Sequence, residues 1–585
     1  MKRFRSILAL ILALVTVLAL CACGTKTDTP TNKPSDNAPT EAPANDGPGA
    51  DTPADDPGSS INTTVGEKNL SPSTYDMFAE KVEPIEATKT IDIGYTQNLG
   101  GTYNPVGANG TTVPDLLGGL VYDMTFYFDG DAGNAMYSRI LEDWYQEDDM
   151  TFVMKLRPGI YFQTKEGKYC EMTGEDLLFS YQAHVLQNTN FQAHFVVFDY
   201  EASYVSDDGL TLYLKTAGTE PYGPMPRPVS VISKKWVEEN GWDTELWASD
   251  PCSSGPYTAG TFVSGSSVSC VLRDTPWWNY DYRQTNVKEY VLHYYTEIST
   301  MYIDLEMGTI DLAFALDSQD YDRALNEKPE NIAVETTTSG NLWFLGVYGS
   351  RGQNQYLADI KVREAIAHAV DWEAVAKACF GSMYGPAWSA ISPNSPYYTE
   401  GLVDCYEYDP ELAKSILEEA GYKEGEVVFN NVNFGKQAKV AEAIQGYLAA
   451  VGITMNVETY EFLTTLQSWL GVGEPPCDTA FNDQTDASGE PCDNIGFYST
   501  HTEGGFPVLQ STDEHWNDLY YQLKHSKEGR QELCDEIATY VHDNYLFYPC
   551  GICYDSYGYR TDVIRDANYF GTFVGLDLSL MDVID

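Results

Sequence analysis

The residue patterns that support enzymatic chemistry are missing from this 585-residue sequence. It contains no HExxH, no GxxxxGKS/T, no GxSxG, and no GxGxxG placed after a strand. Its eight histidines show no metal-ligand spacing. Paired acids such as Asp304/Glu306 and Asp371/Glu373 suit acid–base work on a glycan only at the right separation in space. These patterns favour a binding protein without metal or cofactor. A secreted glycoside hydrolase or carbohydrate-binding protein is the rival from a different class.

Cysteine is the other residue type with potential chemistry, and the sequence has 12. Cys550-Gly-Ile-Cys553 has the spacing of a redox pair but lacks the strand–CxxC–helix context that supports redox work. Outside the cytosol, an even number of cysteines indicates disulfides, although sequence alone does not fix their connectivity. The candidate local pairs are Cys252 with Cys270 and Cys477 with Cys492.

Composition and charge set the class of protein. There are 86 acidic against 35 basic residues, a net charge of −51, with 43% hydrophobic and 13% aromatic residues. That apolar fraction is too high for a disordered acidic chain, and the length predicts about two to four domains. The negative charge disfavours nucleic acid as a partner, because it repels a phosphate backbone.

The N-terminus has the pattern of an export signal. Three cations among the first five residues precede an apolar run over 7–22, which is shorter than the ~20 residues of a spanning helix. Leu20-Cys21-Ala22-Cys23-Gly24 resembles a bacterial lipobox, with leucine three residues and a small residue one residue before the acceptor cysteine. We expect residues 1–22 to be a lipoprotein signal peptide and Cys23 to carry the lipid.

A tether is expected over residues 23–66. From Gly24 to Ser60 there is no Val, Ile, Leu, Met, Phe, Trp or Tyr, and there are seven prolines. Such a segment cannot bury enough apolar area to offset its ordering entropy. The sequence therefore predicts an extracytoplasmic folded body, held to the cell membrane by a lipid and a flexible tether.

The rest of the chain mixes strand and helix patterns. Thr173 has the position of an N-cap, and Gly381 follows an apolar stripe that it would end. Helices that stop at glycine before a short strand favour βαβ-like units. We expect strands at 90–95, 151–156, 210–214 and 453–457, and helices from Thr173, over 362–380, from 409 to 421 and over 436–451.

Short motifs occur in a fixed order across nearly the whole mature chain. They are Ile140–Trp144, Lys155–Phe162, Met172–Ser180, Ser254–Tyr257, Leu305–Asp311, Asp359–Asp371, Asp409–Lys414 and Glu419–Tyr422. Together they resemble the family 5 extracellular solute-binding proteins, the oligopeptide- and dipeptide-binding lipoproteins of ABC importers. Most of these motifs are turns and caps, so they identify the scaffold and do not touch ligand.

The resemblance implies an α/β fold of the periplasmic-binding-protein type (type II, large peptide-binding class), with two hinged lobes and mixed sheets. The chain would cross between lobes near 318–330 and 540–550. The expected segments are a first lobe over 67–325 with an inserted subdomain at about 126–224, a second lobe over 326–544, and a return to the first lobe over 545–585.

The resemblance also implies a ligand site. In this family a carboxylate of the second lobe often pairs with the α-amine of the ligand, which needs such a partner when enclosed. Asp486 is the best match to that carboxylate and Asp483 the second, with a spacing one residue longer than the family pattern. The further ligand-binding candidates are Tyr95, Tyr103, Trp343, Phe344, Trp388 and Gly435.

The implied function is that of a receptor for an ABC importer. It would capture oligopeptides by lobe closure and deliver them to the permease. Its partners would be the small solute, the permease subunits and the membrane through the lipid anchor, and it would be a monomer. Within the family, a sugar, a nickel chelate or a signalling peptide are the alternative ligands.

Overall fold

The structure is a computed structural model that describes most of the chain from Glu86 to Ile584. The chain divides into two units, Met1–Ser60 and Ile61–Asp585, and every described residue lies in the second. The expected signal peptide, Cys23, the tether and Asp486 lie outside the described residues. The described ranges are 86–96, 102–106, 119–129, 135–148, 150–187, 195–216, 228–263, 265–274, 286–347, 354–460, 462–469, 476–483, 491–496, 513–526, 528–567, 578 and 581–584.

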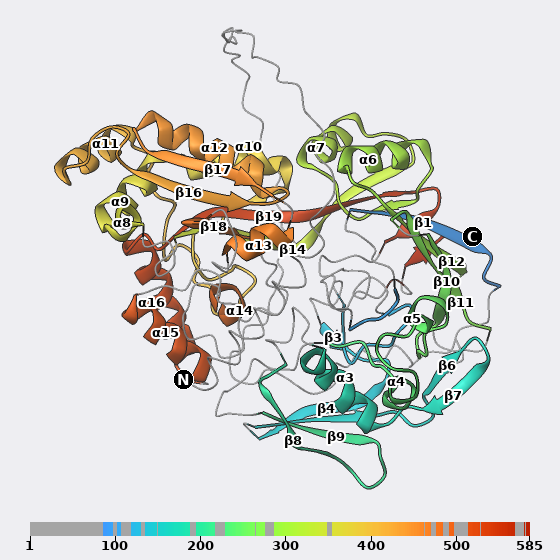
Figure 1. The fold of residues 1–585 in the computed structure, drawn as a ribbon. Helices are drawn as coiled ribbons and strands as arrows, with labels where there is room; N and C mark the ends of the chain where they lie inside the picture. The colour runs from blue at the N-terminus through green and yellow to red at the C-terminus, as the bar shows by residue number, and fades with distance from the viewer. Residues whose placement is uncertain are drawn as a thin grey trace, which may run out of the picture. The chain divides into compact units, whose positions relative to one another are not determined.

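One mixed sheet organises the described chain, and it contains eleven strands (Figure 1). Its order is β10-β11-β12-β1-β13-β19-β14-β18-β16-β17, and β15 pairs with β19 off this path. The first region is built on β1 and β10–β13, the second on β15–β18, and β14 with β19 connects them. The bounds are β1 (Lys89–Tyr95), β10 (Tyr257–Val263), β11 (Ser267–Leu272), β12 (Val287–Tyr294), β13 (Leu312–Ala313), β14 (Ile332–Val347), β15 (Tyr384–Gly385), β16 (Val428–Asn433), β17 (Thr454–Thr459), β18 (Thr479–Asn482) and β19 (Phe547–Arg560).

The core of the first region forms around β1, which is parallel to both β12 and β13. Ile91 and Ile93 are fully buried, as the alternation of apolar residues in this strand predicts. A Cβ added at Gly255 would lie 2.3 Å from the carbonyl oxygen of Leu120, so only glycine allows these backbones to approach. This motif glycine therefore holds the scaffold together.

A smaller sheet in the order β4-β5-β9-β8 carries the inserted segment of the first region. Helix α3 packs on β8 and β9, and the expected N-terminal cap is confirmed: Asp176 accepts the N–H of Thr173 at 2.9 Å. Asp176 also accepts the N–H of Lys234 at 2.8 Å, which joins α3 to α4. The bounds are β2 (Tyr127–Asp129), β3 (Ala135–Tyr137), β4 (Leu141–Asp148), β5 (Thr151–Leu156), β6 (Tyr161–Thr164), β7 (Gly167–Glu171), α3 (Gly174–Leu186), β8 (Phe198–Val205), β9 (Thr211–Thr216), α4 (Lys234–Asn240) and α5 (Leu246–Ser249).

The second region has helices on both faces of the sheet (Figure 1). Alternate residues of β14 enter two different cores, because side chains of a strand point to opposite faces. Trp343 and Leu345 pack with the helices α9–α12, whereas Leu342 and Phe344 pack with α15 and α16. The bounds are α6 (Ile298–Met307), α7 (Ser318–Glu327), α8 (Gln355–Ala358), α9 (Ile360–Ala369), α10 (Trp372–Phe380), α11 (Pro410–Glu419), α12 (Gln437–Ala450), α13 (Phe462–Trp469), α14 (Pro491–Ile495), α15 (Glu514–His525) and α16 (Arg530–Asp543).

The single helix expected over 362–380 is wrong, because the structure has two helices there, α9 and α10. Val370 is extended, with φ −113° and ψ 129°, and Asp371 begins a new helix by accepting the N–H of Ala374 at 2.9 Å. An aspartate side chain competes with helix continuation and favours a cap. The apolar periodicity runs through this break, so it does not reveal the break.

Two long strands, β14 and β19, connect the two regions and pair antiparallel with each other. The crossings expected near 318–330 and 540–550 fall on α7 and on the end of α16, just before these strands. Residues with left-handed backbones precede both: Asn331 (φ 65°) before β14 and Tyr545 (φ 53°) before β19. These strained positions mark where the chain turns into the connecting strands.

The buried cysteines of the first region are not joined. Cys252 and Cys270 are separate thiols, 1% and 0% exposed, so the disulfide expected from their spacing is not present. Burial raises the pKa of both thiols, which keeps them protonated. Cys477 Sγ lies 2.9 Å from the carbonyl oxygen of Thr479, and its pairing with Cys492 stays a prediction.

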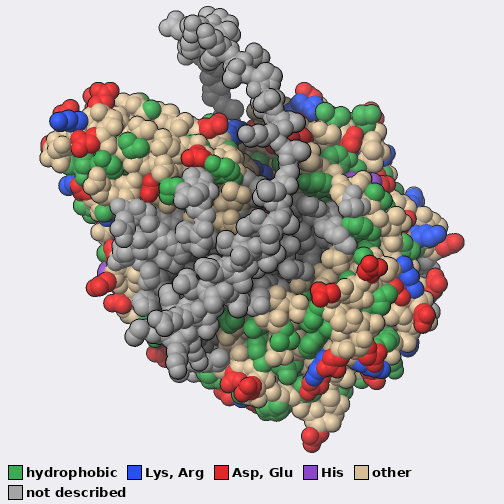
Figure 2. All heavy atoms as spheres, in the orientation of Figure 1, with side chains coloured by type: hydrophobic (Ala, Val, Ile, Leu, Met, Phe, Trp, Pro, Cys, Tyr) green, Lys and Arg blue, Asp and Glu red, His purple; other side chains and the backbone are tan. Residues whose placement is uncertain are grey.

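Acidic side chains are spread over the visible surface and form no single field (Figure 2). This distribution suits solubility, because scattered charge keeps molecules apart without directing them to one partner. Within the described ranges, no helix combines the length and the apolar character needed to cross a bilayer. The short hairpin near the C-terminus consists of β20 (Ile564–Asp566) and β21 (Asp582–Val583).

Candidate ligand-binding site

Three strands of the second region end at one edge of the sheet. Because β16 is parallel to both β17 and β18, their last residues, Asn433, Thr459 and Asn482, lie along the same edge. In open α/β sheets, ligands bind outside the carboxyl ends of the strands. The segments that follow these three strands are therefore the candidate site.

A chain of buried amides and hydroxyls fixes this edge. The Asn431 amide donates to the carbonyl oxygen of Thr479 at 3.1 Å, and the Asn433 amide donates to Asn431 Oδ1 at 2.9 Å. Thr459 Oγ1 then donates to Asn433 Oδ1 at 2.8 Å. Both asparagine side chains are fully buried, so each bond replaces one that water would make. The strand ends are thereby held as a rigid base for the site.

Helix α12 begins four residues after the end of β16. Gly435 has φ +54°, a conformation that favours glycine, and its turn leads from β16 into the helix. Lys436 occupies the N-cap position and is exposed. Gln437 is 1% exposed; its Oε1 accepts the N–H of Phe434 at 3.4 Å, and its amide is directed toward Asp483, whose pKa it lowers.

Asp483 follows β18 and is half-buried at this edge. The pKa of its carboxyl is raised to about 6, chiefly by burial and also by the negative charge of Asp555, while the Gln437 amide and the Lys436 charge act to lower it. The carboxyl is therefore poorly compensated by the surrounding protein. Raised carboxyl pKa values with a named charge partner are typical of functional sites.

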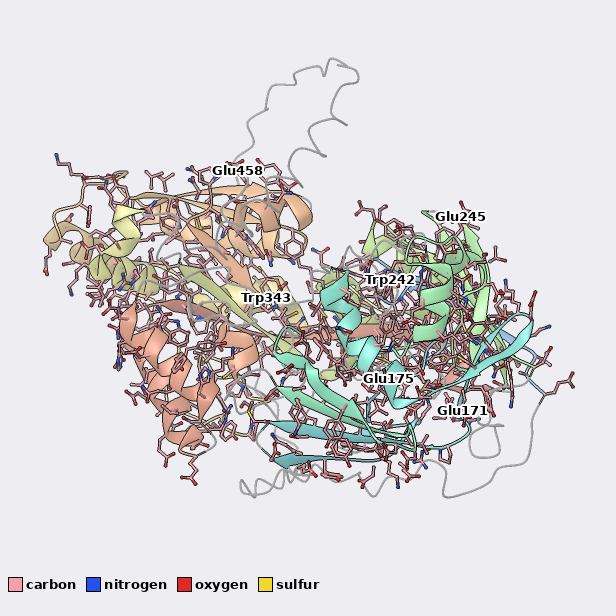
Figure 3. All side chains as sticks on the ribbon, turned by 60° about the horizontal axis from the view of Figure 1, so that its bottom comes forward. Glu171, Glu175, Trp242, Glu245, Trp343 and Glu458 are labelled. Carbon is pink, nitrogen blue, oxygen red and sulfur yellow. The ribbon has the colours of Figure 1, made fainter. Side chains whose placement is uncertain are left out.

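Trp343 and Phe344 point to opposite faces of β14, and both are core residues. Trp343, labelled in Figure 3, is 2% exposed. Its ring packs on that of Phe380, with 5.1 Å between the ring centroids. Phe344 is fully buried and packs on Phe547 at 6.0 Å. Ligand contact through either side chain stays a prediction, and their packing means that truncating them first affects stability.

The tyrosine candidates lie in the core of the first region. Tyr103 is 1% exposed and its hydroxyl donates to the carbonyl oxygen of Ser269 at 2.5 Å. Tyr95 is 2% exposed and meets Phe314 edge-on at 6.5 Å. Trp388 differs from them, since it is half-buried against the core formed by α9–α12. It is therefore the aromatic candidate that keeps surface for a ligand.

The structure adds three residues that the sequence did not single out. They are Lys436, Gln437 and Asp555, which all act on the site of Asp483. Gly435 before a helical stripe was the one local signal for the first two, because such a turn exposes a helix N-terminus. For Asp555 the sequence offers no signal, since it lies more than 70 positions from Asp483 on another strand.

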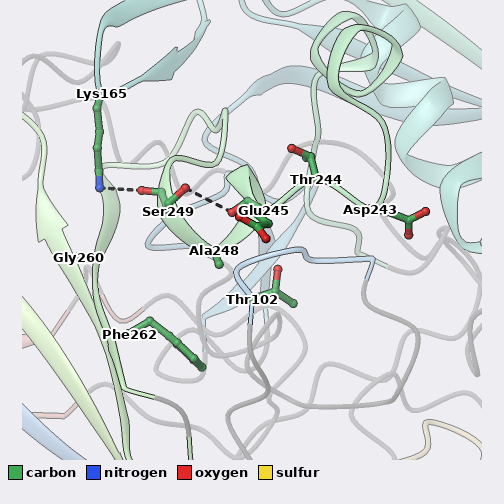
Figure 4. Close-up of a pocket in the computed structure, with 9 residues that line it drawn as sticks. All are labelled: Thr102, Lys165, Asp243, Thr244, Glu245, Ala248, Ser249, Gly260 and Phe262. Carbon is green, nitrogen blue, oxygen red and sulfur yellow. Dashed lines mark hydrogen bonds between the residues drawn. The ribbon is translucent and has the colours of Figure 1, made fainter.

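Two surface hollows lie elsewhere. One of about 690 Å³ is lined by Thr102, Lys165, Asp243, Thr244, Glu245, Ala248, Ser249, Gly260 and Phe262 (Figure 4). Its Lys165 Nζ already donates to the carbonyl oxygen of Ser249 at 2.6 Å, and the acids beside it are exposed. The other, about 390 Å³, lies between α15 and α16 around Tyr540. Because their polar groups are exposed or already hydrogen-bonded, these two hollows are weaker candidates for a ligand site than the strand edge.

Metal and thiol chemistry find no support in the described part of the chain. It contains no cluster of three or more His, Cys, Asp or Glu that could hold a metal ion. Cys550 and Cys553 are buried on β19; burial raises the pKa of both thiols, and that of Cys553 reaches about 12. Protonated thiols on a strand do not suit redox exchange.

The class of protein follows from this arrangement. The two regions carry helices on a shared sheet and are joined by two long strands, and polar residues lie at the strand ends. This arrangement defines a two-lobed solute-binding fold. The same fold is found in the ABC transporter-associated periplasmic binding protein DppA from Helicobacter pylori in complex with the peptide STSA. The TM-score is 0.69 at 19% sequence identity, over 85% of this chain and 98% of that one. NikA from Staphylococcus aureus in complex with Ni(L-His)2 matches with a TM-score of 0.65 at 15% identity, over 85% and 100%.

The sequence identifies the family. Residues 135–488, more than half of the chain, match the model of the bacterial extracellular solute-binding proteins, family 5 (Middle). The chain therefore belongs to this family of extracellular binding proteins.

Among curated relatives, the dipeptide-binding protein of Escherichia coli (strain K12) is 34% identical over 116 residues. That stretch covers 19% of this chain and 22% of the relative. The chain thus spans about a fifth of the length of this relative.

Proposed function

We propose that this protein is the extracytoplasmic receptor of an ABC importer, and that it captures oligopeptides by lobe closure and delivers them to the permease. The observation that carries the proposal is the membership of residues 135–488 in the family 5 solute-binding proteins. The names of its relatives add to it, because the E. coli protein is a dipeptide-binding protein and the H. pylori structure contains a peptide. The fold itself does not choose the solute.

The candidate site supports a ligand with a free amine. Asp483 is a half-buried carboxylate at the carboxyl edge of the sheet, beside the N-terminus of α12 and the Gln437 amide. A ligand ammonium would supply the opposite charge that the carboxylate lacks. Asp486, three residues further on, is the alternative acid for this role. Trp388 would offer an aromatic surface to a ligand side chain.

The proposed mechanism is a shift between open and closed states. The ligand bridges the two lobes and stabilises the closed form by its differential affinity for that form. The left-handed residues Asn331 and Tyr545, which precede β14 and β19, are the proposed hinge positions. The permease would then recognise the closed form.

Native mass spectrometry of the freshly purified protein tests the proposal. A distribution of short peptide masses bound to the chain is the expected result. A single sugar or a metal chelate would contradict the peptide assignment, and the second of these would match the alternative suggested by NikA. No bound mass, together with no binding of a peptide mixture in solution, would contradict it as well.

A secreted glycoside hydrolase remains the rival from another class. Incubation of the protein with a panel of glycans and with peptides separates the two, because a receptor binds its ligand saturably and returns it unchanged. Release of cleaved product at a rate proportional to protein concentration would establish the hydrolase and contradict the receptor.

The membrane anchor is the second part of the proposal. Cys23 would carry the lipid, and residues 23–66 would tether the folded body to the membrane. The variant Cys23→Ala is expected to lose labelling by a radioactive or clickable fatty acid and to leave the membrane fraction. Labelling equal to that of the parent protein would contradict Cys23 as the lipidation site.

A further inference from the structure

Three tyrosines lie in one row across the four-stranded sheet of the first region. Tyr145 of β4 pairs with Val153 of β5, which also pairs with Tyr213 of β9. Tyr213 in turn pairs with Tyr204 of β8. Directly opposed residues of antiparallel strands project from the same face of a sheet. The four side chains therefore form a continuous line from one edge strand to the other, and we call its aromatic members the tyrosine row.

The tyrosine row occupies the outer face of this sheet. Leu212 and Leu214, on either side of Tyr213 in β9, are fully buried in the core that α3 also enters. Because neighbouring residues of a strand point to opposite faces, the tyrosines project away from α3. Figure 1 shows α3 on the side of the sheet that faces the rest of the first region. Tyr204 and Tyr145 are accordingly 49% and 39% exposed.

The rings make a contiguous apolar surface. Those of Tyr204 and Tyr213 are stacked, with 4.6 Å between the centroids and 9° between the ring planes. Val153, which lies between Tyr145 and Tyr213 in the row, is only 1% exposed although it points to the same face. A single exposed aromatic residue needs no explanation, but a contiguous exposed patch is typical of an interaction site.

The row itself carries no charge, and the lysines on either side of it already have acceptors. Lys155 Nζ lies 2.5 Å from Glu142 Oε1. On the other side of the row, Lys215 Nζ donates to Thr151 Oγ1 at 2.6 Å, and Lys215 pairs across the strands with Asp199. A phosphate, sulfate or carboxylate would need a free cation, and neither lysine offers one. The surface therefore suits a neutral partner whose hydroxyl groups can meet the tyrosine hydroxyls.

The size of the row limits what can bind to it. Neighbouring strands are about 4.8 Å apart, so the row is roughly 14 Å long from β4 to β8. Because its outer rings are 39% and 49% exposed, it offers roughly 200–300 Å² of surface. A stable protein interface buries about 800 Å² on each partner. The row is thus too small to hold a second copy of the chain, and it fits a narrow, extended ligand of a few rings.

The proline-rich tether is the other occupant that the chain itself offers. Aromatic grooves bind polyproline helices, which have about three residues per turn, so the contacting prolines must repeat at that spacing. Between Pro30 and Pro57, successive prolines are four or five residues apart. They do not share one face of such a helix, and the tether does not match the row.

We propose that the tyrosine row binds a neutral glycan of β-1,4-linked sugar rings, outside the candidate solute site. Such a glycan is extended, and each ring has an apolar C–H face that packs on tyrosine while its hydroxyls bond to the phenolic oxygens. Tyr145 and the face of the Tyr204 ring that is not stacked on Tyr213 would make the main contacts. The inference goes beyond the proposed receptor function and does not rest on it. Carbohydrate binding and solute capture would then be two properties of one chain.

Isothermal titration calorimetry of the purified full-length protein tests this inference. The probes are cellohexaose and N-acetylated chitohexaose, which are β-1,4-linked and extended, and maltohexaose, which is α-1,4-linked and curved. The parent is expected to bind at least one β-1,4-linked probe, and Tyr204→Ala and Tyr145→Ala to bind it about tenfold or more weakly. Tyr204→Phe retains the ring and should stay within about threefold of the parent. Tyr521→Ala is the matched control, expected within about twofold, because Tyr521 is also 49% exposed but lies on α15.

Several outcomes would overturn the inference and leave the receptor function standing. They are no binding of either β-1,4-linked probe by the parent, equal binding by the parent and both alanine variants, and maltohexaose bound as tightly as the extended probes. A loss in Tyr204→Phe as large as that in Tyr204→Ala would also overturn it, because ring stacking would then not be the basis of binding. So would light scattering that shows a dimeric parent and a monomeric Tyr204→Ala, since the row would then be a contact between copies.

Discussion

One acid–cation site in each region of the described chain can be compared, and the two sites differ in how far the protein balances the charges. In the first region, Asp123 and Arg139 form an ion pair at 3.0 Å with both side chains fully buried. Arg139 also donates to the carbonyl oxygen of Gly119 at 2.8 Å and to the hydroxyl of Tyr127. In the second region, two half-buried acids share the charge of one exposed lysine.

The difference separates a charge that the protein itself pairs from one that the proposed ligand would pair. Removing one partner of a buried pair leaves the other charge uncompensated, and the first site pairs one carboxylate with one guanidinium. At the second site, burial and the charge of Asp555 raise the pKa of Asp483, and the Gln437 amide and the Lys436 charge offset this only in part. Such imbalance lowers stability, and the cation of the proposed ligand would reduce it.

The largest change in stability is expected at the buried pair of Asp123 and Arg139. Asp123→Asn leaves Arg139 buried without a counter-charge, so we expect a loss of about 3–5 kcal/mol in the free energy of unfolding. Urea unfolding measures it. The double variant Asp123→Leu with Arg139→Met is the control, because replacing both partners by apolar residues is expected to restore most of the loss. If Asp123→Asn lowers the free energy of unfolding by less than about 1 kcal/mol, the pair behaves like an exposed one and this prediction is contradicted.

Trp343 and Trp388 allow the same comparison between a core residue and a candidate ligand-binding residue. Trp343 is buried, so Trp343→Ala is expected to lose about 3–5 kcal/mol of stability. Trp388 is half-buried, so Trp388→Ala should lose only about 1–2 kcal/mol while reducing peptide affinity. Denaturant unfolding and calorimetric titration of both variants provide the two numbers. Equal peptide titration curves for Trp388→Ala and the parent would remove Trp388 from the site.

At Asp483, a smaller change in stability with the opposite sign is expected. The pKa of Asp483 is about 6 in the folded protein and lower in the unfolded chain, so its ionised form destabilises the fold above pH 6. Asp483→Asn should therefore stabilise the protein by about 1–2 kcal/mol at neutral pH. The gain should shrink as the pH falls through 6 and vanish below the unfolded pKa. Urea unfolding across this range, with Glu458→Gln as control, measures it; a loss of stability at neutral pH would contradict it.

The smallest effect is expected at an exposed ion pair. Lys414 and Glu411 lie 2.8 Å apart on α11, with 43% and 82% of their side chains exposed. Solvent screens such a pair, so Lys414→Ala should change stability by less than about 1 kcal/mol. Thermal unfolding at low and high salt checks this. A larger, salt-sensitive loss would show that distance alone, without burial, determines the strength of these pairs.

Local patterns in the sequence predicted much of the scaffold. Thr173 precedes α3 as expected, the strand at β1 alternates as expected, and the family resemblance is confirmed by the match over residues 135–488. These succeed because caps, glycine stops and apolar periods act over a few neighbouring residues. The helix over 362–380 failed because the cap at Asp371 interrupts a stripe that itself continues.

The site was predictable only where it follows a strand. Asp483 is found from the family pattern after an apolar strand, and Gly435 from the turn before a helix. Asp555 and Gln437 gain their significance from the pairing of β14 with β19 and from the position of helix α12 beside Asp483. Neither feature leaves a mark in the local sequence, since both depend on strands far apart in the chain.

By itself, the sequence determined the family, the acidic character and the candidate acid Asp483, because these depend on composition and on motifs of neighbouring residues. Only the tertiary structure decided which charges are balanced. Asp123 finds Arg139 at 3.0 Å, whereas Asp483 is brought together with a second acid, Asp555. The reason is physical: burial and Coulomb interaction depend on distance in space, and the fold alone sets that distance.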